Sequence, residues 1–360
     1  MSMKMPQNRA RLTVGATALT AIALLVAGCT SGTPQPEATV ADPGADRLAL
    51  AKEEGSIVWY SGFAEGASNT LAEGFEEQTG ITVEVVRLGG EEVYSRVMSE
   101  ASVGASGADV VTTGDAAHFE GFKQSGLLVK FTSLHDSEIL EQFKDPDGYY
   151  YSPYMLRFGV GFNTDKVSAD QMPTSWAELA ADSTWDNQVV TSNPAFSVGA
   201  AAVPFFWDEQ LEDGYIDKVA ALHPQVFQSV TDALAPVETG EKAISLVAPY
   251  YAVRNSMEKG SPVDTVFMTD GVPVTLAGTG ILTSAEHPNA AAAFTDYLMS
   301  AEGQQLFADD NRDVGNADVT YHDGYVKLSE IEDLIYIIDP VAFADDIERI
   351  RNEFTAKFGV

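Results

Sequence analysis

A short apolar run, Ser56-Ile57-Val58-Trp59-Tyr60-Ser61-Gly62, is typical of a buried strand that ends in a tight turn of small residues. The residues that follow alternate between predicted helices and predicted strands. Helices are predicted over 67–79 and 91–102, and strands over 81–86 and 108–111. This alternation predicts a parallel, doubly wound α/β sheet. Ligands bind to such sheets beyond the carboxyl ends of the strands.

The rest of the chain also mixes strands and helices. An extended, aromatic-rich segment is predicted over 149–162, and a helix begins at Trp176 after Thr174 or Ser175 as its cap. Later strands are predicted over 188–191, 243–247, 263–267 and 280–283, and later helices over 289–299, 302–307 and 340–358. The 360 residues exceed what one hydrophobic core usually holds, so we expect two domains.

Acidic residues dominate the charge of the chain. There are 53 Asp and Glu against 21 Lys and Arg, which gives a formal net charge of −32 at pH 7. Such a field repels nucleic acid, so nucleic-acid binding is excluded. The acidity otherwise indicates solubility or adaptation to salt, and it leaves room for a cleft whose local field has the opposite sign.

The N-terminus has the pattern of an export signal. Lys4, Arg9 and Arg11 precede an uncharged, apolar stretch over 12–28, and the only cysteine, Cys29, follows it directly. The run Val26-Ala27-Gly28-Cys29 resembles a bacterial lipobox, so residues 1–29 are predicted to be a lipoprotein signal peptide whose Cys29 is lipidated. The alternative is an ordinary secretory signal with a chance cysteine. Residues 30–46 are rich in proline and glycine and are predicted to be a flexible linker.

Seven short motifs occur in a set order along the chain. They are IVWYSG (57–62), ADVV (108–111), GFNTDKV (161–167), WAEL (176–179), GEKAI (240–244), YYAVR (250–254) and AEGQQ (301–305). In this order, from about Gly55 to Phe307, the chain resembles the substrate-binding lipoproteins of ABC transporters, in the extracellular branch that binds ferric iron or phosphonates.

The resemblance implies a two-lobed, type II periplasmic-binding-protein-like fold, in which doubly wound α/β sheets are joined by a hinge. By similarity, residues 47–153 and 270–312 would form lobe 1, and residues 154–269 and 313–360 would form lobe 2. The ligand would lie between the lobes, which close over it by hinge motion. This division follows from the resemblance and not from the periodicity of the sequence.

Polar residues at two strand ends are the first candidates for ligand binding. Ser61 and Gly62 offer a hydroxyl and backbone N–H groups to an oxyanion, although they would also suit an ordinary tight turn. Thr112 and Thr113 offer two more hydroxyls at the end of the third strand. Asp115 follows them and could either bind a polar ligand or cap the next helix.

The remaining candidates lie in the expected second lobe. Asn193 and Ser197 stand between a strand and a helix N-terminus, where backbone amides favour an anion. Arg157 offers a guanidinium that would suit a phosphonate or carboxylate. Tyr250 and Tyr251 match the tyrosine pair of the family, which coordinates Fe(III) through both phenolates in iron-binding members; in other members such a ring can wall the cleft or bind an anion.

Two departures from the iron-binding pattern decide the order of the ligand hypotheses. No histidine follows the first strand, where the chain has Gly62-Phe63-Ala64-Glu65, and Phe162 stands where a tyrosine is common. The five histidines are expected at the surface. We therefore rank a small anionic or polar solute, of the phosphonate or phosphate-ester type, slightly above Fe(III) held by Tyr250 and Tyr251.

The resemblance also implies the partners and the location. The protein would act outside the cytoplasm as a monomer, anchored to the outer face of the cell membrane through Cys29, and it would deliver its ligand to an ABC permease and its ATPase. No cofactor is expected, with Fe(III) only as a transported ligand. The other classes considered are a non-transport sensor or interaction lipoprotein and an anchored hydrolase. The chain lacks G-x-S-x-G, H-E-x-x-H and C-x-x-C, so we do not expect an enzyme.

Overall fold

The structure is a computed structural model that describes residues 38–360, apart from 43, 106 and 197. The expected signal peptide, Cys29 and most of the expected linker lie outside these residues. Helix α1 (Ala45–Glu54) begins within the last part of that linker. In the described part of the chain, no helix has the length and apolar character needed to cross a membrane.

The first sheet contains the strands predicted from the opening of the sequence. Its order is β2 (Thr82–Arg87), β1 (Ser56–Ser61), β3 (Val110–Thr113), β11 (Gly278–Ile281) and β4 (Tyr150–Tyr151). Strand β1 pairs in parallel with both β2 and β3, whereas β11 runs antiparallel to β3 and β4. This confirms the doubly wound arrangement predicted for the stretch up to β3.

Helices pack on this sheet through aromatic residues. They are α2 (Glu65–Thr79), α3 (Gly90–Ser102), α4 (Ala116–Gln124), α10 (Pro288–Met299) and α11 (Ala301–Asp309). Trp59 of β1 lies 4.9 Å from Phe294 of α10, and Phe75 of α2 lies 5.2 Å from the same ring, measured between ring centres. All three side chains are buried, so residues far apart in the sequence share one hydrophobic core.

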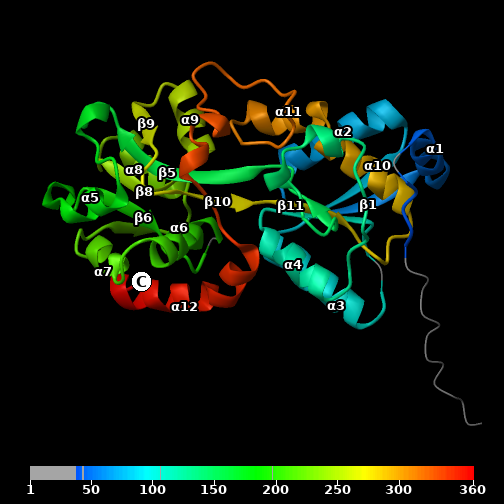
Figure 1. The fold of residues 1–360 in the computed structure, drawn as a ribbon, viewed down its shortest axis with the longest axis horizontal. Helices are drawn as coiled ribbons and strands as arrows, with labels where there is room; N and C mark the ends of the chain where they lie inside the picture. The colour runs from blue at the N-terminus through cyan, green and yellow to red at the C-terminus, as the bar shows by residue number, and fades with distance from the viewer. Residues whose placement is uncertain (1–37, 43, 106, 197) are drawn as a thin grey trace, which may run out of the picture. The chain divides into compact units, whose positions relative to one another are not determined.

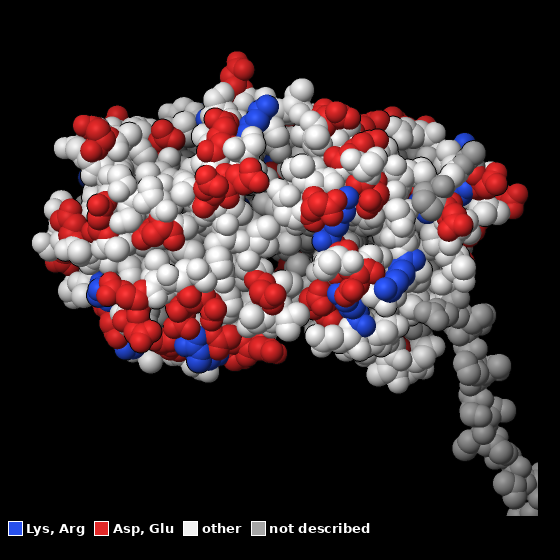
Figure 2. Space-filling view, in the orientation of Figure 1, with Lys and Arg blue, Asp and Glu red and all other residues white. Residues whose placement is uncertain are grey.

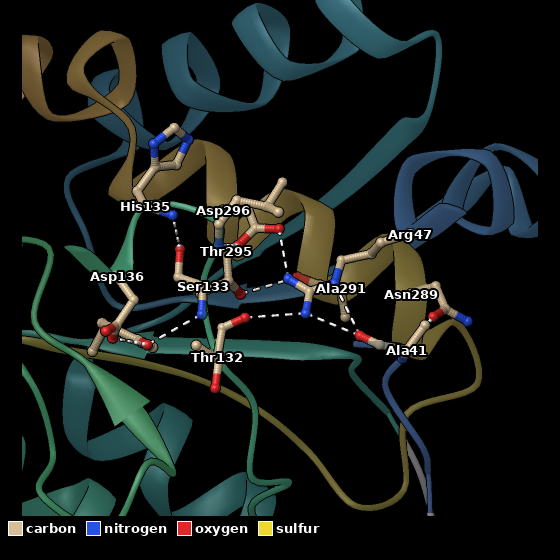
Figure 3. A network of polar contacts seen from close by, with 12 residues as sticks. Ala41, Arg47, Thr132, Ser133, His135, Asp136, Asn289, Ala291, Thr295 and Asp296 are labelled. Carbon is tan, nitrogen blue, oxygen red and sulfur yellow. Dashed lines mark hydrogen bonds and ion pairs between the residues drawn. The ribbon is translucent and has the colours of Figure 1, made fainter. Parts of the chain in front are cut away.

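A buried ion pair fixes α1 to this core (Figure 3). Arg47 Nη1 lies 2.8 Å from Asp296 Oδ2 of α10, and Arg47 Nη2 donates to the carbonyl oxygens of Ala41 and Thr132. The second carboxylate oxygen, Asp296 Oδ1, accepts a hydrogen bond from the backbone N–H of Leu134. Because each charge has several partners, the pair is compatible with complete burial.

The second sheet is built mainly from the middle of the chain. Its order is β12 (Ile335–Ile337), β10 (Val272–Leu276), β5 (Met155–Asn163), β8 (Ile244–Pro249), β6 (Val189–Ser192) and β7 (Gln225–Phe227), and β9 (Val263–Val266) also pairs with β5. Its helices include α5 (Trp176–Ala181), α6 (Val198–Gln210), α7 (Tyr215–Ala220), α8 (Ala235–Glu238), α9 (Tyr250–Glu258) and α12 (Pro340–Phe358). A second hydrophobic core lies here, around Trp176, Phe206 and Trp207.

The chain crosses between the two sheets at several points, which confirms the prediction of two α/β lobes (Figure 1). One crossing joins β4 to β5 and another joins β10 to β11 through Ala277, whose N–H donates to the carbonyl oxygen of Tyr154. Strand β10 pairs with β5 and β12 in the second sheet, although it lies within the 270–312 range assigned to lobe 1. The exact lobe boundaries stay a prediction.

Candidate functional site

The polar groups at the ends of β1 and β3 form hydrogen bonds within the protein. Ser61 Oγ lies 2.8 Å from Ser68 Oγ of α2 and accepts the backbone N–H of Phe63 at 3.2 Å. The N–H of Gly62 donates to the carbonyl oxygen of Thr112 at 2.8 Å, and a Cβ atom at Gly62 would approach that oxygen to 3.0 Å. In this conformation these groups stabilise the strand ends, so a ligand that used them would have to compete with internal hydrogen bonds.

The residues after β3 form a polar cluster with a histidine that we expected at the surface. Asp115 caps α4, since its Oδ1 accepts the N–H of Ala117 at 2.9 Å. Thr113 Oγ1 lies 3.1 Å from Nδ1 of His118, which is only 7% exposed, so the surface expectation was wrong for this histidine. Burial raises the pKa of Asp115, partly offset by the charges of His118 and of Arg351 from α12.

Glu91 and Arg351 bring charge to the same place from two different lobes. Glu91, at the start of α3, lies 3.5 Å from Nε2 of His118, and this contact lowers the pKa of Glu91, with a smaller contribution from the charge of Arg351. Arg351 Nε donates to the carbonyl oxygen of Pro194 at 3.1 Å. Helices α4 and α12 are in contact, so the first lobe's strand ends and the second lobe's C-terminal helix face each other here.

The loop after β6 carries the anion-binding candidates of the second lobe. Asn193 is buried, its N–H donates to the carbonyl oxygen of Phe227, and its Oδ1 accepts the N–H of Ala195 at 2.9 Å. Asn193 therefore shapes the turn that leads to α6. Ser197 lies outside the described residues. The proposed roles of both residues in ligand binding stay predictions.

Arg157 and Tyr250 belong to a cluster inside the second lobe, which we call the buried arginine cluster: Arg157, Tyr250, Asp313 and Tyr325. Arg157 Nε lies 3.1 Å from Asp313 Oδ2, and its Nη2 donates to the carbonyl oxygen of Val326. The guanidinium carbon lies 4.1 Å from the ring centre of Tyr250. All four side chains are buried. Arg157, one of the residues predicted to bind ligand, is therefore engaged in an internal ion pair.

The C-terminal segment partners most polar atoms of this cluster, although Arg157 Nη1 is buried without a hydrogen-bond partner. Tyr325 Oη donates to Asp313 Oδ1 at 2.6 Å, and Tyr250 Oη accepts the backbone N–H of Val326 at 2.9 Å. Burial raises the pKa of Asp313 to about 6, against the opposing influence of Arg157 and of the hydrogen bond from Tyr325. The Tyr250 phenol thus faces residues of its own chain.

Tyr251 enters a second cluster, the open arginine cluster: Tyr154, Tyr251 and Arg312. The guanidinium carbon of Arg312 lies 4.7 Å from the ring centre of Tyr154 and 4.3 Å from that of Tyr251. Arg312 Nε lies 2.8 Å from Asp310 Oδ2, and the side chain keeps 18% of its surface exposed. Within the described residues, neither Nη atom of Arg312 has a hydrogen-bond partner.

The open arginine cluster lies where the chain crosses between the lobes. Tyr154 stands between β4 and β5, Tyr251 is the second residue of α9 in the second lobe, and Arg312 follows α11 of the first lobe. The hydroxyl of Tyr154 points toward Gly114, at the carboxyl end of β3, because a Cβ atom there would lie 3.6 Å from it. Sequence patterns gave no sign of this grouping, since its members come from three separate segments.

Metal binding has limited support from the donor atoms. In the described ranges, no group of three or more His, Cys, Asp or Glu residues is placed to hold a metal ion. A ferric site would therefore depend on tyrosine oxygens. Tyr250 and Tyr251 are adjacent in the sequence, but their rings pack against different arginines.

Comparison with known proteins places the chain in a family. The profile described as "Bacterial extracellular solute-binding protein" matches residues 105–323. Iron uptake protein A1 of Synechocystis is 25% identical over 296 residues, which cover 77% of this chain and 78% of that protein.

Solved structures share the fold over most of the chain. Iron-bound HitA from Pseudomonas aeruginosa superposes with a TM-score of 0.71 at 20% identity, covering 83% of this chain and 99% of HitA. AfuA from Actinobacillus pleuropneumoniae, solved with fructose-6-phosphate, superposes with a TM-score of 0.67 at 21% identity, covering 85% and 99% of the two chains. With the fold, the crossing points and the profile in agreement, this chain belongs to the family of bacterial extracellular solute-binding proteins.

Proposed function

We propose that the chain is the substrate-binding component of an ABC importer, which captures a small anionic or polar solute between its two lobes and delivers it to the permease. The observation that carries this proposal is the position of two arginines where the lobes meet. Arg312, whose Nε pairs with Asp310, stands at the crossing between the lobes, and Arg351, whose Nη1 pairs with Glu348, faces the strand ends of the first lobe. The guanidinium N–H groups that these pairs leave over could donate to an anion.

The outer surface is mainly acidic, in contrast to the arginine side chains where the lobes meet. Figure 2 shows Asp and Glu spread over both halves of the visible face, with few Lys and Arg among them. A free anion is repelled by such a surface, so binding needs a site that is sheltered from it and supplies its own donors. A phosphonate or phosphate ester, which offers several charged oxygens, suits such a site. AfuA, a relative in fold, was solved with fructose-6-phosphate.

Transport would use the motion between the lobes. Ligand contacts with both lobes favour the closed form, and the permease would engage that form productively. Helices α4 and α12 already touch across the lobes, so closure has a defined contact. A lipid on Cys29 would hold the binding protein at the outer face of the membrane through the predicted linker. This would raise the effective concentration of the binding protein near the permease.

Fe(III) is the second candidate ligand. It is favoured by the adjacent phenols of Tyr250 and Tyr251 and by relatives such as the Fe(3+)-binding periplasmic protein of Serratia marcescens, which is 21% identical over 269 residues. The guanidinium groups of Arg157 and Arg312 lie against these two rings and would repel a trivalent cation. For this reason we place the anionic solute first. Neither a catalytic nor a sensor function is proposed.

Native mass spectrometry of freshly purified mature protein would identify the solute that copurifies. We expect a mass increment of a small anion, and a smaller radius of gyration by small-angle X-ray scattering when that solute is added. No copurifying ligand together with an unchanged radius for all candidate solutes would argue against the importer function. A phenolate-to-iron charge-transfer colour on addition of ferric citrate would instead select the iron alternative.

A further inference from the structure

The open arginine cluster contains three side chains with polar ends that the protein itself does not use. Within the residues that the structure describes, the Nη atoms of Arg312 and the hydroxyls of Tyr154 and Tyr251 make no hydrogen bond. Tyr154 is nevertheless only 7% exposed, and Arg312 is largely covered by the two rings. These polar atoms are not completely buried, so a guanidinium edge and two hydroxyls from three segments are accessible to a ligand.

The backbone beside Arg312 is held in an uncommon conformation. Asn311 has φ of 58°, the left-handed region that non-glycine residues rarely adopt. Its Nδ2 donates to Asn255 Oδ1 and Glu258 Oε1 of α9, at 2.9 and 3.0 Å, while its Oδ1 is buried without a partner. Asparagine tolerates this region better than most residues, and its bonds to α9 hold the turn that leads to Arg312.

We propose that Tyr154, Tyr251 and Arg312 bind the charged end of the solute, and that this end is a phosphoryl or phosphonyl group. This assignment rests on the proposed function and adds the residues that would hold the charged group. The two rings lie against the guanidinium and Asp310 occupies Nε, which leaves the edge with the two Nη atoms for a ligand. That edge matches two oxygens of an oxyanion in a forked arrangement.

The phenols explain the preference for a phosphoryl group over a carboxylate. A carboxylate has two oxygens, which the Arg312 edge alone would satisfy. A phosphoryl group has a third oxygen, and the hydroxyls of Tyr154 and Tyr251 can donate to it. Burial raises the pKa of Tyr154, so this hydroxyl keeps its proton near neutral pH and remains a donor.

A structural explanation competes with this assignment, because Arg312 also ties segments of the two lobes together. Under that explanation, substitutions in the cluster would change stability and leave anion affinity unaltered. Isothermal titration calorimetry distinguishes the structural explanation from the binding assignment. The three probes are inorganic phosphate, fructose-6-phosphate and acetate. Thermal melting without ligand reports the structural contribution.

For the unmodified protein we expect binding of fructose-6-phosphate or inorganic phosphate and no binding of acetate. Tighter binding of the ester identifies a solute with an organic part, whereas equal binding identifies the free ion. Arg312→Gln should weaken phosphate binding on the order of 100-fold, since it removes a charged, two-pronged contact. Arg96→Gln is the matched control, because it also removes one positive charge, from an exposed side chain on α3 that pairs with Glu100. It should leave the affinity unchanged.

If Arg312→Gln melts much earlier than the parent protein, Arg312→Lys and Tyr251→Phe provide the test. Arg312→Lys keeps the charge without the fork, and Tyr251→Phe keeps the ring without the donor. Equal affinity for the phosphate probes in these folded variants and the parent would overturn the assignment, as would binding of acetate alone or of no probe. A neutral solute found by native mass spectrometry would also overturn it while leaving the importer function intact.

Discussion

Two arginines contact the first two residues of α9 and have opposite environments. Both stack on a tyrosine of the pair: Arg157 on Tyr250, and Arg312 on Tyr251. Arg157 is fully buried and faces Asp313, and its cluster is closed by the C-terminal segment. Arg312 keeps part of its surface exposed and has free Nη atoms within the described residues. The same chemical groups thus build a structural element in one cluster and a candidate binding site in the other.

The contrast follows from the geometry of the helix. Successive residues of an α-helix are separated by about 100° around its axis, so Tyr250 and Tyr251 cannot point in one direction. One ring turns into the lobe and the other toward the crossing between the lobes. Adjacency in the sequence is therefore weak evidence for a shared ligand, and a contribution from Tyr154, far away in the sequence, is geometrically as natural.

The largest expected difference between the clusters concerns the loss of a carboxylate. At pH 7.5, where Asp313 is ionised, Asp313→Ala would leave both the Arg157 charge and the Tyr325 hydroxyl without their buried partner, which should lower the free energy of unfolding by about 3–5 kcal/mol. Asp310→Ala removes the corresponding carboxylate of the open arginine cluster, where the side chain is 46% exposed, and should cost less than about 1 kcal/mol. Urea denaturation of both variants measures the two values. Equal losses would contradict the division into a structural and a binding cluster.

The pH dependence of stability should report on Asp313 in the buried arginine cluster. Burial raises the pKa of Asp313 from its usual 3.8 to about 6, so between these values the folded protein holds a proton that the unfolded chain has lost. Relative to Asp313→Asn, the parent protein should therefore lose on the order of 2–3 kcal/mol of stability as the pH rises from about 4 to 6.

Urea denaturation of the parent and Asp313→Asn proteins at several pH values between 4 and 7.5 checks this difference. The subtraction removes the contribution of the other carboxylates, which titrate in both proteins. A difference that stays constant, or that favours the parent protein as the pH rises, would show that Asp313 titrates in another way.

The sequence predicted most of the fold because the signals are local. The run Ser56–Gly62 and the residues up to β3 have strong periodicity, and α12 was predicted with the bounds that the structure gives. Strands β10 and β12 were missed, and both pair with strands far away in the sequence: β12 with β10, and β10 with β5. The helix-cap alternative for Asp115 was open in the sequence, and the structure places Asp115 as that cap.

The site was less predictable, for a physical reason. Polar residues at strand ends can be recognised from their position, but whether Ser61 or Thr112 is free depends on the tertiary hydrogen bonds that occupy them. Arg157 carries a charge that suited an anion, yet its partner Asp313 lies far along the chain. Arg312 had no local pattern to mark it, since its two rings arrive from other segments.

Substitutions of Tyr250 and Tyr251 test the difference between the two clusters. One should change the stability and the other the affinity for the ligand. Tyr251→Phe removes a free hydroxyl and should weaken binding of fructose-6-phosphate about tenfold, with little change in stability. Tyr250→Phe leaves the N–H of Val326 without its acceptor and should lower the free energy of unfolding by about 1–2 kcal/mol, with affinity unchanged. Calorimetry measures the affinity of both variants, and urea denaturation measures their free energy of unfolding. Equal losses of affinity would instead indicate that both phenols contact the ligand, as the iron alternative requires.

The smallest expected effect concerns the residue that orients Arg312. Asp310 Oδ2 holds Arg312 Nε at 2.8 Å, while Oδ1 accepts a hydrogen bond from Asn255 Nδ2 at 2.8 Å. Asp310→Ala should weaken binding of the phosphate probe about threefold, because the guanidinium gains freedom that binding must then remove. Asp310→Asn, which retains an oxygen acceptor, should restore most of the loss. A failure of this rescue would mean that Asp310 acts by joining the lobes and not by aiming Arg312 at the anion.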